Sequence, residues 1–317
     1  MKIIGTGSAI PRKQVSNDDI ARFLDTSDEW IFPRTGIRSR HVITDERLED
    51  LASQAAQSAL QMAGLTVEDI DLFICSNVVN EYMTPGLSSI ISAKTGLHCP
   101  CMDINCACPG FIYAMDIADS YFAAGKVNNV LVVCAEEPSK MTSWQDRSTC
   151  VLFGDGAGAA VLTLGDGLRG IKLYSEPSPD KIWEYRNLMP TPYVVKQEED
   201  VPLQMKGREV FRFAVSTSVR DIRKLVEDAG LRLEDVDHFM IHQANMRIVD
   251  AIRSELNVDE SKFHTNIYDH GNSSSASCPI LLDECNRAGC FKKGDILVFS
   301  AFGAGLLSGA ALLEWQI

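Results

Sequence analysis

The sequence predicts an α/β protein that consists of two similar halves. Short, nearly continuous apolar runs alternate with amphipathic stretches along the 317 residues, a pattern that is typical of strands buried by helices on both faces. The segment AGLTVEDIDLF at residues 63–73 reappears as AGLRLEDVDHF at residues 229–239, and residues 129–135 match residues 295–301 at the same offset of 166. Two matches in one register indicate an internal duplication, with a period far too long for a solenoid.

The duplication predicts the same order of elements in each half. Amphipathic spacing predicts the helices and continuous apolar spacing predicts the strands, while glycines such as Gly64 end the helices. Along the chain we expect helix 51–63, strand 71–75, helix 114–124, strand 130–134, helix 215–229, strand 238–241, helix 280–288 and strand 296–300.

The boundary between the halves is expected near a turn signal. Gly165-Asp166-Gly167 suits a turn, and we therefore divide the chain into residues 1–166 and residues 167–317. Residues 175–202 contain five prolines and many charges, so we interpret them as a long excursion at the start of the second half.

The composition is that of an ordinary globular protein, with 45% hydrophobic and 23% charged residues. No apolar run reaches the roughly 18–20 residues of a membrane-spanning helix, and ten cysteines without a secretory signal indicate free thiols in a reducing cytoplasm. The net charge of −13 disfavours nonspecific binding to nucleic acid or anionic lipid. Basic residues recur in one stretch of the second half, at Lys206, Arg208, Arg212, Arg220, Arg223, Lys224, Arg247 and Arg253.

Three residues with complementary chemistry lie where strand patterns give way to helix patterns: Cys108, His242 and Asn272. A thiol, an imidazole and a carboxamide can form a thiolate-based acyl-transfer site. Each residue also has a simpler interpretation, because a lone cysteine is usually a small buried hydrophobe and Gly-Asn-Ser is ordinary turn chemistry. Shifting Cys108 by 166 residues gives Ser274, two residues from Asn272, so the duplication makes their convergence plausible.

A cysteine that begins a helix meets unpaired backbone N–H groups and the positive end of the helix dipole. We therefore expect a lowered pKa for the Cys108 thiol. Pro109 directly follows the cysteine. Because proline is tolerated in the first helical turn, we expect the strand-to-helix turn at Cys108 to form despite it.

Six ordered motifs surround these residues: EWI at 29–31 with RTGI at 34–37, DINCACPGF at 103–111, DR at 146–147 with FGDGAGA at 153–159, IHQAN at 241–245, GNSSSAS at 271–277 and FGAG at 302–305. With them the chain resembles the β-ketoacyl-acyl carrier protein synthase III family of the thiolase superfamily along essentially its whole length. The catalytic set distinguishes this family from its relatives. Elongation synthases carry a Cys/His/His set, thiolases use a second cysteine, and chalcone-synthase-like enzymes lack the EWI and RTGI motifs near the N-terminus. The resemblance implies a thiolase-like duplicated fold, with two mixed five-stranded sheets in a five-layer α-β-α-β-α arrangement.

The resemblance also implies a reaction. Cys108 would take an acyl group from acyl-CoA, and malonyl thioester on the carrier protein would then lose CO2. His242 and Asn272 would donate hydrogen bonds to the enolate oxygen, and the oxyanion of the acyl group would meet the backbone N–H groups of Cys108 and Ala304. Phe302 would shape the site and favour loss of the carboxylate.

Substrate-binding residues follow from the same resemblance. Trp30 and Arg147 would sandwich the adenine of CoA, Arg34 would meet the pyrophosphate, and Gly207 and Asn245 would line the pantetheine tunnel. The acidic acyl carrier protein would meet Arg212 and Arg247. The family resemblance implies a homodimer that uses acyl-CoA as a substrate and holds no permanent cofactor.

Two other signals are set aside. Cys99, Cys101, Cys106 and Cys108 mimic metal-ligand spacing, but alternation along an extended chain would point the two pairs in opposite directions, so we expect no metal there. Oxidation of Cys106 with Cys108 is a lesser alternative. Gly5-Thr6-Gly7 resembles a dinucleotide fingerprint, but the third glycine is missing.

Departures from the family pattern leave alternatives open. Residues 80–92 are atypical where relatives shape the acyl pocket from the dimer partner. We expect the initiating condensing enzyme of type II fatty-acid synthesis. A starter-unit synthase or acyltransferase of a secondary-metabolite pathway is the alternative, and a noncatalytic thiolase-fold subunit is disfavoured by the intact Cys108, His242 and Asn272.

Overall fold

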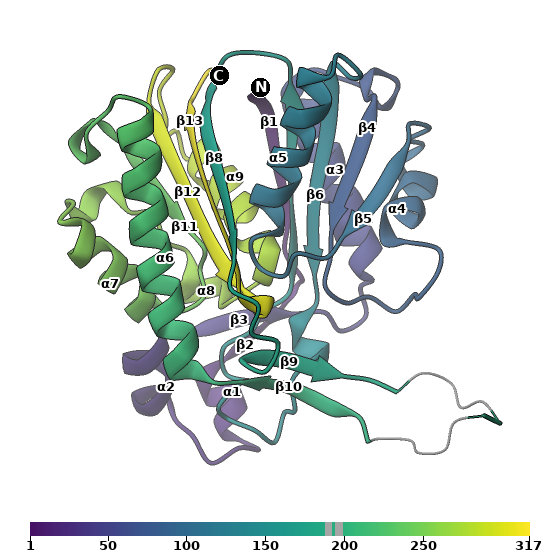
Figure 1. The fold of residues 1–317 in the computed structure, drawn as a ribbon. Coiled ribbons are helices and arrows are strands. Elements are labelled where there is room, and N and C mark those ends of the chain that lie inside the picture. The colour runs from purple at the N-terminus through teal and green to yellow at the C-terminus, as the bar shows by residue number, and fades with distance from the viewer. Residues whose placement is uncertain (188–191, 194–198) are drawn as a thin grey trace.

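The computed structural model describes all residues except 188–191 and 194–198 (Figure 1). The predicted excursion at residues 175–202 therefore lies partly outside the described residues. Its described part contains an antiparallel pair of strands, β9 (Ile182–Tyr185) and β10 (Val201–Met205). Within the described residues, no helix is both long enough and apolar enough to cross a membrane.

The first half forms a mixed five-stranded sheet, as the family resemblance implied. Its order is β1-β7-β6-β4-β5. Strand β4 runs parallel to β5 and β6, whereas β7 is antiparallel to β1 and β6. The strands are β1 (Lys2–Ala9), β4 (Leu72–Ser76), β5 (Cys101–Ile104), β6 (Asn129–Glu136) and β7 (Gly156–Thr163).

The second sheet repeats this order with β8-β13-β12-β11, and it has four strands in the described part of the chain. The expectation of a fifth strand is wrong here. Phe263 makes only an isolated parallel bridge to Phe239, and the chain turns almost at once into the short helix α8 (Ile267–His270). The strands are β8 (Leu168–Ser175), β11 (His238–Ile241), β12 (Ile296–Gly303) and β13 (Leu307–Glu314).

Helices lie between the sheets and on their outer faces (Figure 1). Helices α5 (Gly110–Ala123) and α9 (Ser277–Arg287) contact both sheets. Helices α3 (Leu48–Ala63) and α4 (Leu87–Thr95) cover the outer face of the first sheet, and α6 (Gly207–Asp228) and α7 (Met246–Leu256) that of the second.

Strand β6 shows why the sequences of the buried strands are continuous apolar runs. Val130, Val132 and Cys134 belong to the central core with α5 and α9, whereas Leu131 and Val133 belong to the outer core with α3. Alternate side chains of a strand point to opposite faces, so a sheet covered on both faces needs apolar residues at every position.

The glycines of β1 have a packing role in place of nucleotide binding. A Cβ atom on Gly5 would lie 2.2 Å from the Ala59 carbonyl oxygen, and one on Gly7 would lie 2.2 Å from the Ala55 carbonyl oxygen. Only glycine allows the backbone of α3 to come this close to the strand.

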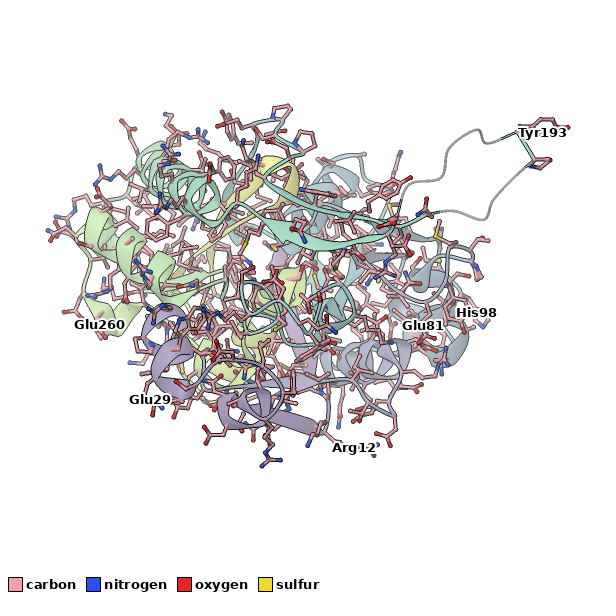
Figure 2. All side chains as sticks on the ribbon, turned by 90° about the horizontal axis from the view of Figure 1, so that it is seen from below. Arg12, Glu29, Glu81, His98, Tyr193 and Glu260 are labelled. Carbon is pink, nitrogen blue, oxygen red and sulfur yellow. The ribbon has the colours of Figure 1, made fainter. Side chains whose placement is uncertain are left out.

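A smaller layer covers the lower end of both sheets in Figure 1. It contains the antiparallel pair β2 (Lys13–Ser16) and β3 (Ser39–Val42), the helices α1 (Asn17–Ala21) and α2 (Asp28–Thr35), and the pair β9 and β10. In the view from below, Arg12 and Glu29 lie at the edge of this layer (Figure 2). Short 3-10 helices occur at Val67–Asp69, Pro138–Lys140, Leu233–Asp235, Glu260–Lys262, Ser274–Ala276 and Ala304–Leu306.

Candidate active site

One cavity of about 920 Å³ brings the three candidate residues together. Cys108 comes from the corner before α5, His242 from the end of β11, and Asn272 from the segment before α9. Asn272 follows helix α8, so the predicted strand-to-helix corner at this residue is wrong for the same reason that the fifth strand is missing. Apolar residues supply much of the remaining lining, among them Met141, Ile182, Leu203, Met205 and Phe211.

Cys108 lies at a tight corner that depends on two glycines. Pro109 is the N-cap residue of α5, with φ of −75°, as the first-turn tolerance of proline predicted. A Cβ on Gly110 would lie 1.9 Å from the Ser76 hydroxyl, and one on Gly303 would lie 2.8 Å from the Cys108 backbone nitrogen. These approaches bring the ends of β4 and β12 against the cysteine.

The predicted lowering of the Cys108 pKa is wrong. Burial raises the pKa of this thiol to about 12, and the negative charge of Glu136 adds to the increase. Hydrogen bonds from Ser274 and from the cysteine's own backbone N–H act in the opposite direction without offsetting the burial. Desolvation therefore outweighs the helix terminus, and the resting thiol is protonated.

A buried carboxyl group lies behind Cys108. The Ser274 hydroxyl is 3.7 Å from the Cys108 sulfur and 3.3 Å from Oε1 of Glu136. The Ser275 hydroxyl donates to the same oxygen at 2.5 Å, and the Val78 backbone N–H donates to Oε2 at 3.1 Å. Burial raises the pKa of Glu136 to about 7, so this carboxyl group changes its charge near neutral pH.

His242 is buried and is oriented by Ser277. Its Nδ1 lies 2.6 Å from the Ser277 hydroxyl, whose oxygen also accepts from the Gln243 backbone N–H at 3.4 Å. When this hydroxyl donates its proton to Nδ1, the proton of the neutral ring is on Nε2. Burial lowers the pKa of His242 to about 3, so the ring is a neutral hydrogen-bond donor.

Asn272 is oriented in a comparable way. Its Oδ1 accepts from the Ser274 backbone N–H at 2.9 Å, while its backbone pairs with Leu152 and Gly154. The preceding Gly271 has φ of 65°, a left-handed conformation that favours glycine. With Oδ1 occupied, the two N–H groups of the amide remain as donors beside the cavity.

Phe302 and Ala304 both line the cavity. The Phe302 ring contacts His242 edge to face, with 5.4 Å between the ring centroids, and its side chain is buried. Phe302 thus limits where the imidazole can move. Ala304 follows Gly303, which passes over the Cys108 backbone.

The residues predicted to line the pantetheine tunnel and to bind the acyl carrier protein lie at the mouth of the cavity. Gly207, Asn245, Arg212 and Arg247 all line it, together with Arg208. The three arginines are exposed, and no ion pair involves them within the described part of the chain. The other basic residues of this stretch have partners, namely Lys206 with Asp180, Arg220 with Asp221, Arg223 with the Glu255 carbonyl, Lys224 with Asp228, and Arg253 with Asp250.

Trp30, Arg34 and Arg147 form a separate cluster next to the mouth. The guanidinium carbons of Arg34 and Arg147 lie 4.8 Å and 4.9 Å from the centroid of the Trp30 ring. Two stacked layers need about 7 Å, so a base fits between Trp30 and Arg147 only if one of them moves. Asn245 Nδ2 donates to the Arg34 carbonyl at 3.1 Å and thereby connects this cluster to the cavity.

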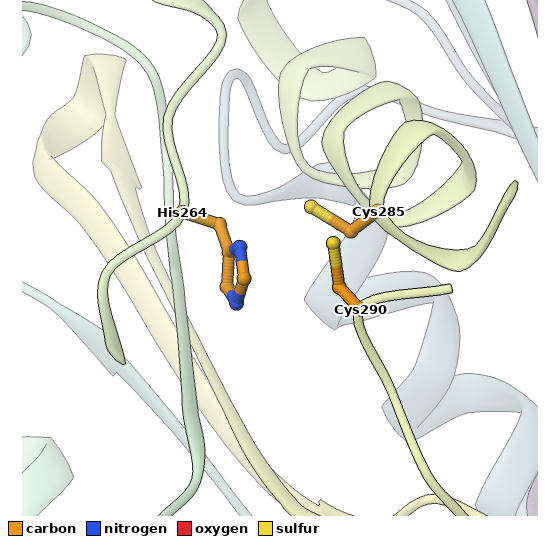
Figure 3. Close-up of side chains that lie close together, drawn as sticks. All are labelled: His264, Cys285 and Cys290. Carbon is orange, nitrogen blue, oxygen red and sulfur yellow. The ribbon is translucent and has the colours of Figure 1, made fainter. Parts of the chain in front are cut away.

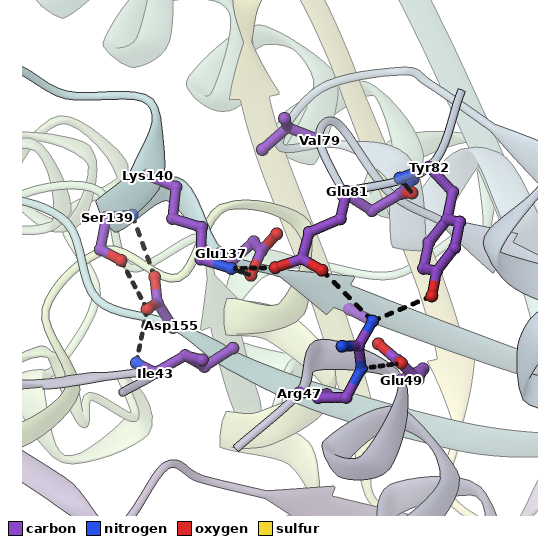
Figure 4. A network of polar contacts seen from close by, with 12 residues as sticks. Ile43, Arg47, Glu49, Val79, Glu81, Tyr82, Glu137, Ser139, Lys140 and Asp155 are labelled. Carbon is purple, nitrogen blue, oxygen red and sulfur yellow. Dashed lines mark hydrogen bonds and ion pairs between the residues drawn. The ribbon is translucent and has the colours of Figure 1, made fainter. Parts of the chain in front are cut away.

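Residues 80–92 are attached to the cavity wall by charged contacts (Figure 4). Glu81 pairs with Arg47 and Lys140 at 3.2 Å each. Lys140 belongs to the segment whose Pro138 and Met141 line the cavity. Beside it, Asp155 accepts from the Ser139 hydroxyl at 2.6 Å and the Ile43 backbone at 2.8 Å, which gives the FGDGAGA motif a structural role.

Four residues of this site were missed in the sequence: Glu136, Ser274, Ser275 and Ser277. Glu136 had a usable signal, because shifting Phe302 back by 166 residues gives Glu136. The same shift relates Ser274 to Cys108. The roles of Ser275 and Ser277 depend on hydrogen bonds that no sequence spacing encodes.

A thiol beside polar donors, in an α/β fold of two similar sheets, is an arrangement that suits a thiol-dependent acyltransferase of thiolase-like architecture. The family described as 3-oxoacyl-[acyl-carrier-protein (ACP)] synthase III matches residues 102–177, and its C-terminal counterpart matches residues 226–315. The β-ketoacyl-[acyl-carrier-protein] synthase III of Aquifex aeolicus is 41% identical, with 99% of each chain covered. That of Clostridium acetobutylicum is 39% identical, over 99% of this chain and 98% of the relative.

Solved structures agree with these relatives. The 3-oxoacyl-[acyl-carrier-protein] synthase III of Aquifex aeolicus aligns with a TM-score of 0.92 at 40% identity, over 99% of both chains. The synthase III of Thermus thermophilus aligns with a TM-score of 0.93 at 37% identity, over 100% of this chain and 99% of the other. The chain belongs to the 3-oxoacyl-[acyl-carrier-protein] synthase III family and is an acyltransferase of that type.

Proposed function

We propose that this chain catalyses the initiating condensation of type II fatty-acid synthesis, from acyl-CoA and malonyl-acyl carrier protein to β-ketoacyl-carrier protein, CoA and CO2. The observation that carries the proposal is the single cavity in which Cys108 lies with two oriented donors, His242 and Asn272. The thiol supplies a nucleophile for a thioester, and the donors suit an oxygen that gains negative charge.

Acyl transfer begins with loss of the Cys108 proton. Burial lowers the pKa of His242 to about 3, so its ring is a weak base. Ser274 instead bridges the thiol to Glu136. The thiol proton passes to Ser274 as the hydroxyl proton of Ser274 passes to Glu136, and the sulfur attacks the acyl-CoA carbonyl. The bond from carbon to the CoA sulfur breaks, and the CoA thiolate takes a proton from water.

Condensation uses the other side of the cavity. The malonyl thioester loses CO2, and the electron pair left behind forms an enolate whose oxygen accepts from His242 and Asn272. The enolate carbon attacks the acyl-Cys108 thioester, whose oxyanion meets the backbone N–H groups of Cys108 and Ala304. The carbon–sulfur bond then breaks, and Glu136 returns its proton through Ser274 to the Cys108 thiolate.

The binding residues divide into two groups. Trp30, Arg34 and Arg147 hold the nucleotide end of CoA, after Arg147 moves to admit the adenine, and Gly207 and Asn245 line the path of the pantetheine. CoA enters as a substrate and no cofactor stays bound. Arg212 and Arg247, joined by Arg208, present unpaired positive charge to the acidic carrier protein.

Three architectural proposals accompany this function. The first is the division into residues 1–166 and 167–317, which is supported by a separate sheet on each side of residue 166. Helices between and outside the sheets support the five-layer arrangement. We also propose a cytoplasmic homodimer in which residues 80–92 reach the partner's acyl pocket, since Met83 is 87% exposed.

The decisive test follows the acyl group. The protein is incubated with a panel of acyl-CoAs, acylation is measured by intact mass, and malonyl-carrier protein is then added. We expect a mass increase of one acyl group that is lost in Cys108→Ala and kept in the control Cys106→Ala, followed by β-ketoacyl product and CO2. Absence of acylation would refute the enzymatic function, and acylation without condensation would favour the secondary-pathway acyltransferase.

A further inference from the structure

A second group of reactive side chains lies away from the cavity. His264, Cys285 and Cys290 gather at the far end of α9, where that helix leads into the loop before β12 (Figure 3). Ser277 begins the same helix at the acyl-transfer site, so the length of α9 separates the two places. No step of the condensation uses these three residues.

The distances suit a metal ion. One atom from each side chain, a ring nitrogen and two sulfurs, lies within 4.8 Å of the other two. Tetrahedral Zn²⁺ binds sulfur at about 2.3 Å and nitrogen at about 2.0 Å, so its ligand atoms are about 3.5–3.8 Å apart. A small contraction brings this group to that spacing, and two thiolates with one imidazole are the ligands that such a cation prefers.

His264 is held by a chain of polar contacts that leaves one ring nitrogen for the sulfurs. Its Nε2 lies 2.9 Å from His238 Nδ1, and His238 Nε2 lies 2.9 Å from Asp295 Oδ2. Figure 3 shows the Nδ1 edge of His264 facing Cys285 and Cys290. A carboxylate-backed histidine of this kind fixes the orientation of metal-binding imidazoles.

We propose that His264, Cys285 and Cys290 bind one thiophilic divalent cation of the zinc type. Cys290 is exposed, which gives the ion a route of entry, and solvent would supply the fourth ligand. The bound ion ties the segment after Phe263 to the end of α9 and to the loop before β12. Metal-free protein would lose this connection without losing the acyl-transfer residues.

A thiol must lose its proton before its sulfur binds a metal ion as a thiolate, so metal binding releases protons.

The test uses the full chain in a Cys108→Ala background, so that the catalytic thiol cannot bind the metal. Reduced protein is titrated with Co²⁺, whose thiolate charge-transfer absorption reports sulfur ligands, and Zn²⁺ is then added in competition. We expect one equivalent to bind, Zn²⁺ to displace Co²⁺, and the thermal midpoint to increase. Cys290→Ser should abolish the absorption without disturbing the core, because Cys290 is exposed.

Two comparisons keep the proposal falsifiable. Cys99→Ser removes a thiol outside the group and should leave binding unchanged, whereas His264→Gln should weaken it at least tenfold. The proposal is overturned if reduced protein shows no charge-transfer absorption, or if Cys290→Ser binds as tightly as its parent. It is also overturned if intact mass shows that Cys285 and Cys290 form a disulfide and the reduced thiols bind no metal.

Discussion

Replacing Glu136 by Gln should change how the stability of the protein depends on pH. The carboxyl group is buried, and its pKa is raised from 4.5 to about 7. A carboxyl group with a raised folded-state pKa favours folding in its protonated form. The corresponding stability is complete below pH 4.5 and is lost as the pH increases through 7.

The magnitude follows from the size of the shift. A pKa that increases from 4.5 to about 7 corresponds, at 1.36 kcal/mol per pKa unit, to roughly 3 kcal/mol of unfolding free energy lost between acid pH and pH 8. The glutamine side chain of the variant has no such titration. The amide oxygen can still accept from the Val78 N–H, but the NH2 group then replaces the oxygen that accepts from the Ser274 and Ser275 hydroxyls. Loss of this acceptor costs about 1–3 kcal/mol at every pH, so only the pH dependence is diagnostic.

Urea unfolding of both proteins between pH 5 and pH 8 measures the effect. The wild type should lose stability relative to Glu136→Gln as the pH increases, with the steepest change between pH 5 and pH 7 and little further change above that range. If the difference between the two proteins is the same at pH 5 and pH 8, Glu136 does not titrate in this range and the raised pKa is refuted. Glu136→Asp serves as the control that keeps a titrating group.

Three further predictions concern catalysis and binding. Ser277→Ala should slow condensation about 10-fold to 10²-fold while leaving acylation intact, a smaller effect than loss of an oxyanion donor itself. Recovery of the condensation rate in Ser277→Thr would support the orienting role of Ser277, and an unchanged rate in Ser277→Ala would contradict it. Gly207→Leu should raise KM for acyl-CoA without lowering the unfolding midpoint, because no atom lies within 4 Å of its Cβ position; a lowered midpoint would mean that the site is packed. The double variant Arg212→Glu with Arg247→Glu should raise KM for malonyl-carrier protein in a salt-dependent way. If KM for acyl-CoA increases equally, these arginines contact CoA and not the carrier protein.

Local pattern predicted most of the fold correctly. Strand β11 has the predicted bounds, and α3, α5, α9, β4, β6 and β12 overlap their predicted ranges. Helix α6 begins at Gly207, eight residues before the predicted start, because its first two turns lie at the cavity mouth and carry a less regular apolar stripe. The fifth strand of the second sheet was expected from the family resemblance and not from local pattern, and within the described residues the chain forms only an isolated bridge at its place, between Phe263 and Phe239.

The site shows where sequence reasoning ends. Motif order placed Cys108, His242 and Asn272 in one cavity, but it did not indicate the protonation states. The pKa of Cys108 depends on its burial, on Glu136 and on Ser274, and the His242 ring is oriented by Ser277. These partners are separated along the chain from the residues that they affect. His264, Cys285 and Cys290 were not recognised because separations of 21 and 5 residues match no common metal-binding motif.

The contact between Cys108 and Ser274 has a consequence for stoichiometry. These residues are separated by the repeat length of 166, yet their side chains touch at 3.7 Å. The two repeats therefore meet at their equivalent corners, and both corners share a single volume. The repeat places the Ser274 hydroxyl where the Cys108 thiol stands in the first half, so the shared cavity has one thiol from this pair of equivalent positions and room for one acyl group is all that the proposed reaction requires.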